Sequence, residues 1–273
     1  VVNEPKAEYS LGGKVNARIW IYTLILGMAA GIGYAILRFL ISPTLTNVKD
    51  IPARYQIDVL GEIPENKGYF SGKGSILDEE REAAGAAVRD EYASSAHFLL
   101  HRLGEEGHQC VYITSAGTDE GKTSVAAHLA LEMSELGKKV LLVDLDVRKP
   151  TLGTVFLDTI EYEHSLNALY RGDASLQDAL VHLKGNLDLL PVILEKRPLP
   201  LSEAVTGMIG SLIGQYDLVL IDSAPIGKVS DPMNLNGITK DVLFVVRYDY
   251  ASLKSIQDSL ERLGKTGANI LGC

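Results

Sequence analysis

The feature that most constrains the fold is a lysine-bearing turn, AGTDEGKTS, which begins at Ala116. It differs by one letter from the pattern G-x-x-x-x-G-K-[ST], because Ala116 stands at the first glycine. The apolar segment CVYIT precedes the turn, and apolar residues recur at helical spacing from Val125 to Leu136 after it. This context predicts a strand, a phosphate-binding loop and a helix. The alternative is a helix that starts at a small-residue turn, with Lys122 in solvent.

A loop of this kind has a definite chemistry. Backbone N–H groups at the start of a helix, together with the positive end of the helix dipole, attract anionic oxygens. The pattern predicts that Lys122 reaches the β- and γ-phosphates of a nucleotide and that the Thr123 hydroxyl is a ligand of Mg²⁺.

Three aspartates follow apolar runs downstream of the loop. The run Val140–Val143 leads into Asp144 and Asp146, and the run Leu218–Ile221 leads into Asp222. Ligands of open parallel sheets bind at the carboxyl ends of the strands, so these carboxylates are expected beside the loop. There they can hold Mg²⁺ and orient a nucleophile. A single aspartate after a strand is more often a cap or turn residue, but three in this order favour a site.

Strand-like and helix-like segments alternate through the rest of the chain. Further strands are predicted at NLDLLPV, DVLFVVR and ANILG, and helices over residues 201–213 and 252–263. The alternation predicts an α/β P-loop NTPase fold, with a mostly parallel sheet covered by helices on both faces. Burial of both faces accounts for the continuous apolar strands.

An uncharged segment near the start, Ile19–Leu37, predicts one transmembrane helix. As a helix it spans about 28 Å, close to the hydrocarbon thickness of a bilayer. Arg18 and Arg38 flank it, and Trp20 and Tyr34 lie near its ends, where amphipathic rings prefer the membrane interface. A secretory signal peptide would have a shorter apolar region followed by a cleavage site.

The predicted membrane helix carries a small-residue pattern but gives no orientation. Gly27 and Gly31 stand in G-x-x-x-G spacing, which permits close helix–helix contact in lipid. Lys and Arg are about equally frequent beside the two ends, so the positive-inside rule gives no direction. If the loop binds ATP, the C-terminal part faces the cytoplasm.

The chain is therefore expected to have four parts. Within the juxtamembrane part, IDVLGEIP is predicted as a short strand and the residues after Pro64 as a linker; from Asp78 to Arg102, helix formers dominate. The chain ends inside a strand-like segment, so we expect it to be a piece of a longer protein. The parts are an extracytoplasmic stub over residues 1–17, a transmembrane helix over 18–42, a juxtamembrane segment and linker over 43–77, and a cytoplasmic P-loop domain over 78–273.

Composition argues against two classes of protein. The formal net charge is −9 and no basic run occurs in the C-terminal two-thirds, which argues against a nucleic-acid partner. The two cysteines, Cys110 and Cys273, make a disulfide scaffold implausible and suit a reducing compartment.

The motifs AGTDEGKTS, VLLVDLDVRKP and LVLIDSAP resemble the Walker A, Walker A′ and Walker B motifs of the bacterial tyrosine kinases of capsule and exopolysaccharide export. The resemblance covers about residues 51–273. The membrane helix and IDVLGEIP resemble the last transmembrane helix and juxtamembrane piece of a polysaccharide copolymerase, fused on one chain. Partition and division-site ATPases carry a further lysine where this chain has Gly117, and no Asn-Lys-x-Asp motif is present, so ATP is expected rather than GTP.

The resemblance implies a role for each motif residue. Asp144 and Asp146 would divide metal positioning and activation of an incoming tyrosine hydroxyl, and Arg148 would favour charge on the phosphates. Phosphoryl transfer needs mainly positioning and charge neutralisation, so this set suffices chemically. The implied catalytic residues are Lys122, Asp144, Asp146 and Arg148; the Mg²⁺ ligands are Thr123, Asp144 and Asp222; and the nucleotide-binding residues are Gly117, Thr118, Asp119, Glu120, Gly121, Lys122, Thr123 and Ser124.

The function implied by the resemblance is a membrane-anchored, ATP-dependent protein-tyrosine autokinase of the inner (plasma) membrane that controls polysaccharide polymerisation and export. The implied partners are the polysaccharide polymerase and export machinery, a cognate tyrosine phosphatase, membrane lipid, and other copies of the chain through membrane and external domains. Two alternatives are a membrane-tethered regulatory ATPase or nucleotide switch, and a chain-length regulator that binds nucleotide passively.

The chain departs from the family pattern in two places. The family's Glu-x-x-Arg-x-x-Arg motif, used in ring assembly, corresponds to Glu91, Ser94 and His97, so we expect the isolated cytoplasmic domain to associate weakly. The family's acceptor tyrosines form a C-terminal cluster that this chain does not contain. Tyr248 and Tyr250 are expected to be structural.

Overall fold

The chain divides into two units, Val1–Pro43 and Thr44–Cys273, and each is described here by itself. The computed structural model describes residues 17–41, 43–65, 75–77, 85–227 and 235–273. Most of the predicted stub (1–17), most of the predicted linker after Pro64 and the start of the helix expected from Asp78 therefore lie outside the described residues.

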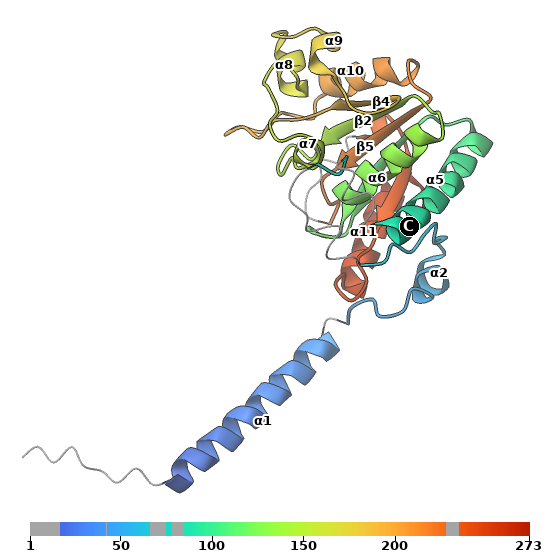
Figure 1. The fold of residues 1–273 in the computed structure, drawn as a ribbon. Helices are drawn as coiled ribbons and strands as arrows, with labels where there is room; N and C mark the ends of the chain where they lie inside the picture. Colours follow the sequence, from blue (N-terminus) through green and yellow to red (C-terminus); the bar gives the residue numbers. More distant parts are fainter. Residues whose placement is uncertain (1–16, 42, 66–74, 78–84, 228–234) are drawn as a thin grey trace, which may run out of the picture. The chain divides into compact units, whose positions relative to one another are not determined.

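The described part of the first unit forms the helix α1 (Ala17–Ile41), drawn in blue in Figure 1. The 20 residues Arg18–Leu37 are long and apolar enough to cross a membrane, and none of them is buried. Trp20 is 66% exposed and Leu26 is 71% exposed, a cost in water that a lipid environment removes. The Thr23 hydroxyl donates to backbone carbonyls of the preceding turn, which satisfies it within the helix. Length and composition are thus consistent with a membrane anchor.

The second unit is built on a seven-stranded sheet with the strand order β3-β4-β2-β5-β1-β6-β7. Every pairing is parallel except that of β3 with β4. The central strands β1, β2 and β5 are buried along their whole length, as their continuous apolar sequences predict. The strands are β1 (Cys110–Ser115), β2 (Val140–Leu145), β3 (Val181–His182), β4 (Leu187–Leu190), β5 (Leu218–Ser223), β6 (Asp241–Val245) and β7 (Asn269–Gly272).

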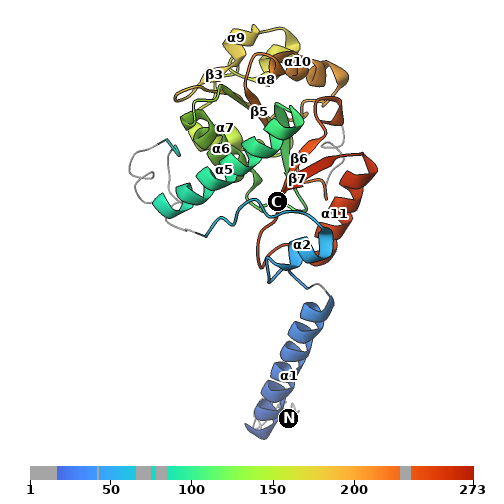
Figure 2. The ribbon, with the colours of Figure 1, turned by 90° about the vertical axis from the view of Figure 1, so that its right-hand side faces the viewer.

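Helices cover both faces of this sheet (Figures 1 and 2). One hydrophobic cluster joins α5 and α6 to strand side chains such as Val111 and Leu142. A second cluster joins α10 and α11 to the alternate strand side chains, such as Tyr112 and Leu141. The predicted fold class is confirmed. The helices are α2 (Asp50–Tyr55), α5 (Ala86–Glu106), α6 (Lys122–Glu135), α7 (Leu152–Phe156), α8 (Leu166–Arg171), α9 (Leu176–Ala179), α10 (Glu203–Ile213) and α11 (Leu253–Lys265).

The strand predicted at IDVLGEIP is wrong. The segment forms one rung beside the end of β7, where the Cys273 N–H donates to the Asp58 carbonyl (2.9 Å) and the Leu60 N–H donates to the Cys273 carbonyl (2.8 Å). It then leaves the sheet edge and runs close to α5, where a Cβ on Gly61 would lie 1.9 Å from the Ser95 Oγ. Glycine at this position permits that approach, and the ladder does not continue.

A test of the membrane anchor uses detergent phase separation. We expect the chain to partition into the Triton X-114 phase, and a chain without residues 1–41 to stay in the aqueous phase, because α1 carries the exposed apolar side chains. Immunoblots of both phases measure the distribution. Recovery of the longer chain in the aqueous phase would contradict the anchor.

Candidate nucleotide site

The predicted phosphate loop joins the end of β1 at Ser115 to the start of α6 at Lys122. Two residues of the loop have left-handed backbone conformations, Asp119 (φ +59°) and Gly121 (φ +91°). Glycine adopts such a conformation at no steric cost, and aspartate tolerates it better than most residues. These turns bring the chain back on itself before the first backbone N–H groups of α6, which are the groups that attract phosphate oxygens.

Glu120 braces the loop from inside. Its side chain is buried, and its carboxylate accepts backbone hydrogen bonds from Ala116 and Gly117. Burial raises the pKa of Glu120 to about 7. A Cβ on Gly117 would lie 2.9 Å from the Glu120 Oε1, so glycine leaves the space that the carboxylate occupies. The structure therefore places Glu120 behind the loop, where its side chain holds the backbone.

Asp144 and Asp222 lie side by side, because they are register partners on the parallel strands β2 and β5. Both are fully buried. The Thr123 hydroxyl donates to the Asp222 Oδ2 over 2.6 Å, which connects the start of α6 to the end of β5. Asp144 accepts from the backbone N–H groups of Asp146 (3.0 Å) and Leu152 (3.2 Å), so it fixes the chain where it leaves β2.

The two buried carboxylates disfavour each other's charge. Burial raises the pKa of Asp222 to about 7, although the Thr123 hydrogen bond and the Lys122 charge oppose the shift. Burial also raises the pKa of Asp144 well above its usual value, and the Asp222 charge adds to the effect. A positive charge beside the pair would therefore favour the ionised form of both carboxyls.

The residues present fit a magnesium ion. The Asp222 Oδ1 is buried and has no hydrogen-bond partner among the described residues, so one oxygen remains for a cation. The Thr123 hydroxyl lies beside it, and Mg²⁺ binds proteins through few carboxylates together with phosphates and water. Both oxygens of Asp144 already accept backbone N–H groups, which suits it less to direct ligation. Among the described residues, no cluster of three or more His, Cys, Asp or Glu side chains has the arrangement of a metal site made by protein alone.

The loop and the end of β2 enclose a cavity of about 360 Å³. Six of the eight predicted nucleotide-binding residues line it; Gly117 and Glu120 do not. The predicted residues Asp146 and Arg148 lie on its wall, whereas Asp144 and Asp222 lie beneath it in the strands. The lining comprises Thr118, Asp119, Gly121, Lys122, Thr123, Ser124, Asp146, Arg148, Lys149, Thr151, Ala224 and Pro225.

Two residues that sequence reasoning missed hold the loop in place. The Lys149 ammonium pairs with the Asp119 carboxylate (2.9 Å), and this contact lowers the pKa of Asp119. Arg247 donates to the Asp119 carbonyl (3.0 Å), and its guanidinium lies over the ring of Tyr250. Lys149 was visible in the sequence as the second cation of VRKP. Nothing in the local sequence places Arg247, 128 positions away, beside the loop.

Comparison with known proteins assigns the family. A family profile described as an AAA domain matches residues 114–269. The chain is 30% identical over 166 residues to tyrosine-protein kinase YwqD of Bacillus subtilis, covering 59% of this chain and 69% of that protein. It is 29% identical over 200 residues to tyrosine-protein kinase etk of Escherichia coli, covering 72% of this chain but 27% of etk. The chain thus spans about a quarter of the length of etk.

Solved structures agree in fold. The kinase domain of Escherichia coli tyrosine kinase ETK superposes with a TM-score of 0.71 at 24% identity, over 83% of this chain and 92% of that one. The BceF tyrosine kinase domain superposes with a TM-score of 0.70 at 21% identity, over 84% of this chain and 97% of that one. With its phosphate loop and paired aspartates, the chain belongs to the bacterial tyrosine kinases, a family of P-loop proteins whose nucleotide domain matches the AAA profile.

Replacement of Asp222 tests the electrostatics of the site. The pKa of Asp222 in the folded protein, about 7, lies above its ordinary value of 3.8. The free energy of unfolding therefore falls as the pH rises from about 4 to 7, because the buried carboxyl must lose its proton. In the absence of ligand, Asp222→Asn should therefore raise the free energy of unfolding more at pH 8 than at pH 5, by on the order of 1–3 kcal/mol. Urea denaturation at the two pH values measures the difference.

The matched control is Asp258→Asn, which changes an exposed carboxyl on α11 and should alter neither value. The same Asp222→Asn substitution should abolish the extra stabilisation that Mg²⁺ adds to that of nucleotide. A variant that is less stable than the parent at pH 8 without ligand would contradict the account.

Proposed function

We propose that this chain is the membrane-anchored catalytic part of an ATP-dependent protein-tyrosine autokinase. The observation that carries the proposal is the 2.6 Å contact between Thr123 and Asp222, beside the buried Lys122. This arrangement presents a hydroxyl, a carboxylate oxygen and an ammonium group to one small space at the start of a helix. Phosphoryl transfer depends on such positioning and charge neutralisation.

Each residue has a distinct role in the proposed reaction. The Lys122 ammonium and the backbone N–H groups of the loop bind the phosphates and neutralise charge as the γ-phosphoryl group transfers. Asp146 lines the cavity and accepts the proton of the incoming tyrosine hydroxyl. Asp144 positions Asp146 through the hydrogen bond from the Asp146 N–H. Arg148, also on the cavity wall, favours charge on the phosphates.

Thr123 and Asp222 would hold the magnesium ion, with Asp144 close behind them. When bound, Mg²⁺ neutralises phosphate charge. A bound divalent cation would favour the ionised form of Asp222 and so lower its raised pKa. ATP is the proposed nucleotide, because the chain has no Asn-Lys-x-Asp motif.

The proposed setting is the inner (plasma) membrane. The helix over residues 18–42 would span it, with residues 1–17 outside and the juxtamembrane segment (43–77) and kinase domain (78–273) in the cytoplasm, where ATP is present. The relatives named tyrosine-protein kinases support the kinase activity, and the resemblance of the three motifs supports the proposed place in capsular or exopolysaccharide polymerisation and export. The proposed partners are the polysaccharide polymerase and export machinery, a cognate tyrosine phosphatase, and other copies of the chain through membrane and external domains.

Self-association of the cytoplasmic domain is expected to be weak. Glu91, Ser94 and His97 lie exposed on α5, at the positions of the family's assembly motif. Serine is too short, and histidine too weakly charged near pH 7, to replace bidentate arginine contacts.

A nucleotide switch is the second candidate, and one observation favours it. Leu45 of the juxtamembrane segment exchanges backbone hydrogen bonds with Asp249 and Ala251 (2.8 and 3.0 Å), and the Tyr248 hydroxyl donates to the Thr46 carbonyl. These contacts hold the same connection between β6 and α11 from which Arg247 reaches the phosphate loop. The phosphate loop and the juxtamembrane segment therefore contact the same connection, and an ATPase or switch without kinase activity would use this link.

Lys122→Met tests the proposal. The substitution removes the ammonium group, so we expect loss of ATP binding by at least about tenfold and loss of phosphoryl transfer to tyrosine. Isothermal titration with Mg·ATP measures the first effect, and an anti-phosphotyrosine immunoblot of an added glutamate–tyrosine copolymer measures the second. Lys254→Met, an exposed change on α11, is the matched control and should leave both at the parental level. If Lys122→Met bound ATP as tightly as the parent, the assignment of the nucleotide site would be wrong. If the parent hydrolysed ATP but formed no phosphotyrosine on the acceptor, the nucleotide switch would be favoured over the kinase.

A further inference from the structure

A second cavity, of about 530 Å³, lies between the end of α8 and the connection from β4 to α10. The connection leaves the carboxyl end of β4, which neighbours β2, so it lies on the same edge of the sheet as the phosphate loop. Ligands of parallel sheets gather at this edge. None of the residues assigned to nucleotide, metal or catalysis lines this cavity.

The connection over residues 191–200 is fixed to α8 by paired contacts. Arg171 binds Glu195 through two parallel bonds, from Nη1 to Oε1 (2.7 Å) and from Nη2 to Oε2 (2.5 Å). Asn167 exchanges two hydrogen bonds with the backbone of Ile193 (3.1 and 2.9 Å). Leu199 is 5% exposed and anchors the far end in the core. A connection held at three points presents its remaining side chains in a fixed position, which lowers the entropic cost of binding a ligand.

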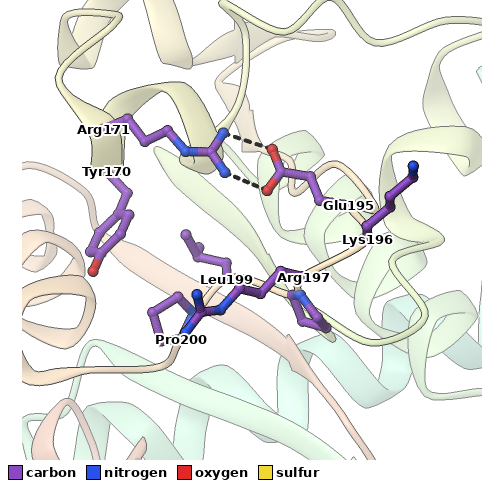
Figure 3. Close-up of a pocket in the computed structure, with 8 residues that line it drawn as sticks. Tyr170, Arg171, Glu195, Lys196, Arg197, Leu199 and Pro200 are labelled. Atoms are coloured by element: carbon purple, nitrogen blue, oxygen red, sulfur yellow. Dashed lines mark hydrogen bonds and ion pairs between the residues drawn. The ribbon is translucent and has the colours of Figure 1, made fainter.

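Two cations of this connection are available to bind a ligand. Lys196 and Arg197 are exposed, and neither makes an ion pair or hydrogen bond with any residue that the structure describes. Arg171 differs, since Glu195 and the Tyr162 hydroxyl occupy its guanidinium. Figure 3 shows the Arg171–Glu195 pair on one side of the cavity, and Arg197, Leu199 and Pro200 on the other. Arg197 is therefore an open guanidinium on the wall of a cavity, able to bind an anion with two parallel hydrogen bonds.

The rest of the wall suits an aromatic ring. Tyr170 contributes its ring from the last turn of α8, and Pro198, Leu199 and Pro200 contribute flat or apolar surface. Ring-to-ring and ring-to-proline contacts favour a planar apolar group, and the cavity exceeds the roughly 360 Å³ of the nucleotide cavity. A ligand that fits both features carries a ring and a strong negative charge on the same short group.

We propose that this cavity binds a phosphotyrosine side chain on a phosphorylated peptide segment. Its ring would lie against Tyr170 and the prolines, its phosphate would pair with Arg197, and Lys196 would add positive charge at the rim. A phosphate group carries about −1.5 to −2 charges and three acceptor oxygens, more than a carboxylate offers. The proposal rests on the proposed kinase function, because that activity supplies phosphotyrosine beside the site. The protein would thus bind phosphotyrosine, the product of its proposed kinase activity, at a site separate from the phosphate loop.

The test measures binding of fluorescein-labelled peptides to the full chain in detergent, by fluorescence anisotropy. The probe is a pentapeptide with phosphotyrosine at its centre and glycine on both sides. The comparison peptides carry tyrosine, phosphoserine or glutamate at the same position. Arg197→Ala should weaken binding of the phosphotyrosine peptide at least about tenfold, the loss expected for a charge-assisted contact, and Lys196→Ala should weaken it less. Lys254→Ala, an exposed charge on α11, should have no effect.

A second arm separates this cavity from the phosphate loop. The phosphotyrosine peptide should bind Lys122→Met as tightly as the parent, because the two cavities share no lining residue. Loss of binding in Lys122→Met, with Arg197→Ala unaffected, would place the peptide at the phosphate loop and overturn the proposal. Equal binding of the phosphoserine or glutamate peptide would show an anion site without ring recognition and would also overturn it. None of these readouts requires kinase activity, so failure here is distinguishable from failure of the proposed function.

Discussion

The contact on which the site depends is the hydrogen bond from Thr123 to Asp222. It joins the first turn of α6 to the carboxyl end of β5, and β5 lies between β1 and β2 in the sheet. The strand register then places Asp144 directly beside Asp222, so one parallel sheet brings the three Walker segments together. Two carboxylates buried at this point cost stability when both are charged, which the raised pKa of Asp222 expresses. Binding of a cation and of phosphate, as proposed, would relieve this unfavourable arrangement, and such strained groups often mark functional sites.

The sequence was sufficient to predict where residues of the candidate site lie, as far as this follows from local spacing and from parallel topology. Lys122 and Thr123 are set by the pattern of the loop, and Asp222 by the rule that strand carboxyl ends meet at one edge. The sequence predicts that these carboxylates lie at that edge, but it does not predict how deeply each one is buried. Asp146 reaches the cavity wall while Asp144, two residues earlier, lies inside strand β2 with both oxygens bound to backbone N–H groups. That difference arises where the strand ends, and strand ends are the least reliable feature to read from a sequence.

Sequence analysis missed other features of the fold and site because they depend on contacts between distant residues or on elements too short to show a periodic pattern. Arg247 holds the phosphate loop across 128 positions, and no local pattern marks such a contact. The Glu120 side chain turns into the loop because backbone N–H groups donate hydrogen bonds to its carboxylate. The spacing of residues in the sequence does not determine such a rotamer. The helices α7, α8 and α9 are too short for helical periodicity, although Ser165 and Ser175 cap two of them as N-cap serines commonly do. The apolar run IDVLGEIP reads as a strand, but Gly61 carries it away from the sheet toward α5.

The central claim is that the cavity beside Lys122 transfers phosphate from ATP to tyrosine. The most direct measurement is mass spectrometry of an added tyrosine-containing acceptor peptide after incubation with the purified protein, Mg²⁺ and γ-¹⁸O-labelled ATP. The account predicts labelled phosphotyrosine on the peptide with the parent protein and none with Asp146→Asn, since Asp146 is the carboxylate that a hydroxyl in the cavity would reach. The control is thermal stabilisation of both proteins by nucleotide, which would show that each still binds ATP. Labelled phosphotyrosine at the parental level with Asp146→Asn, or hydrolysis of ATP by the parent without any phosphotyrosine on the peptide, would contradict it.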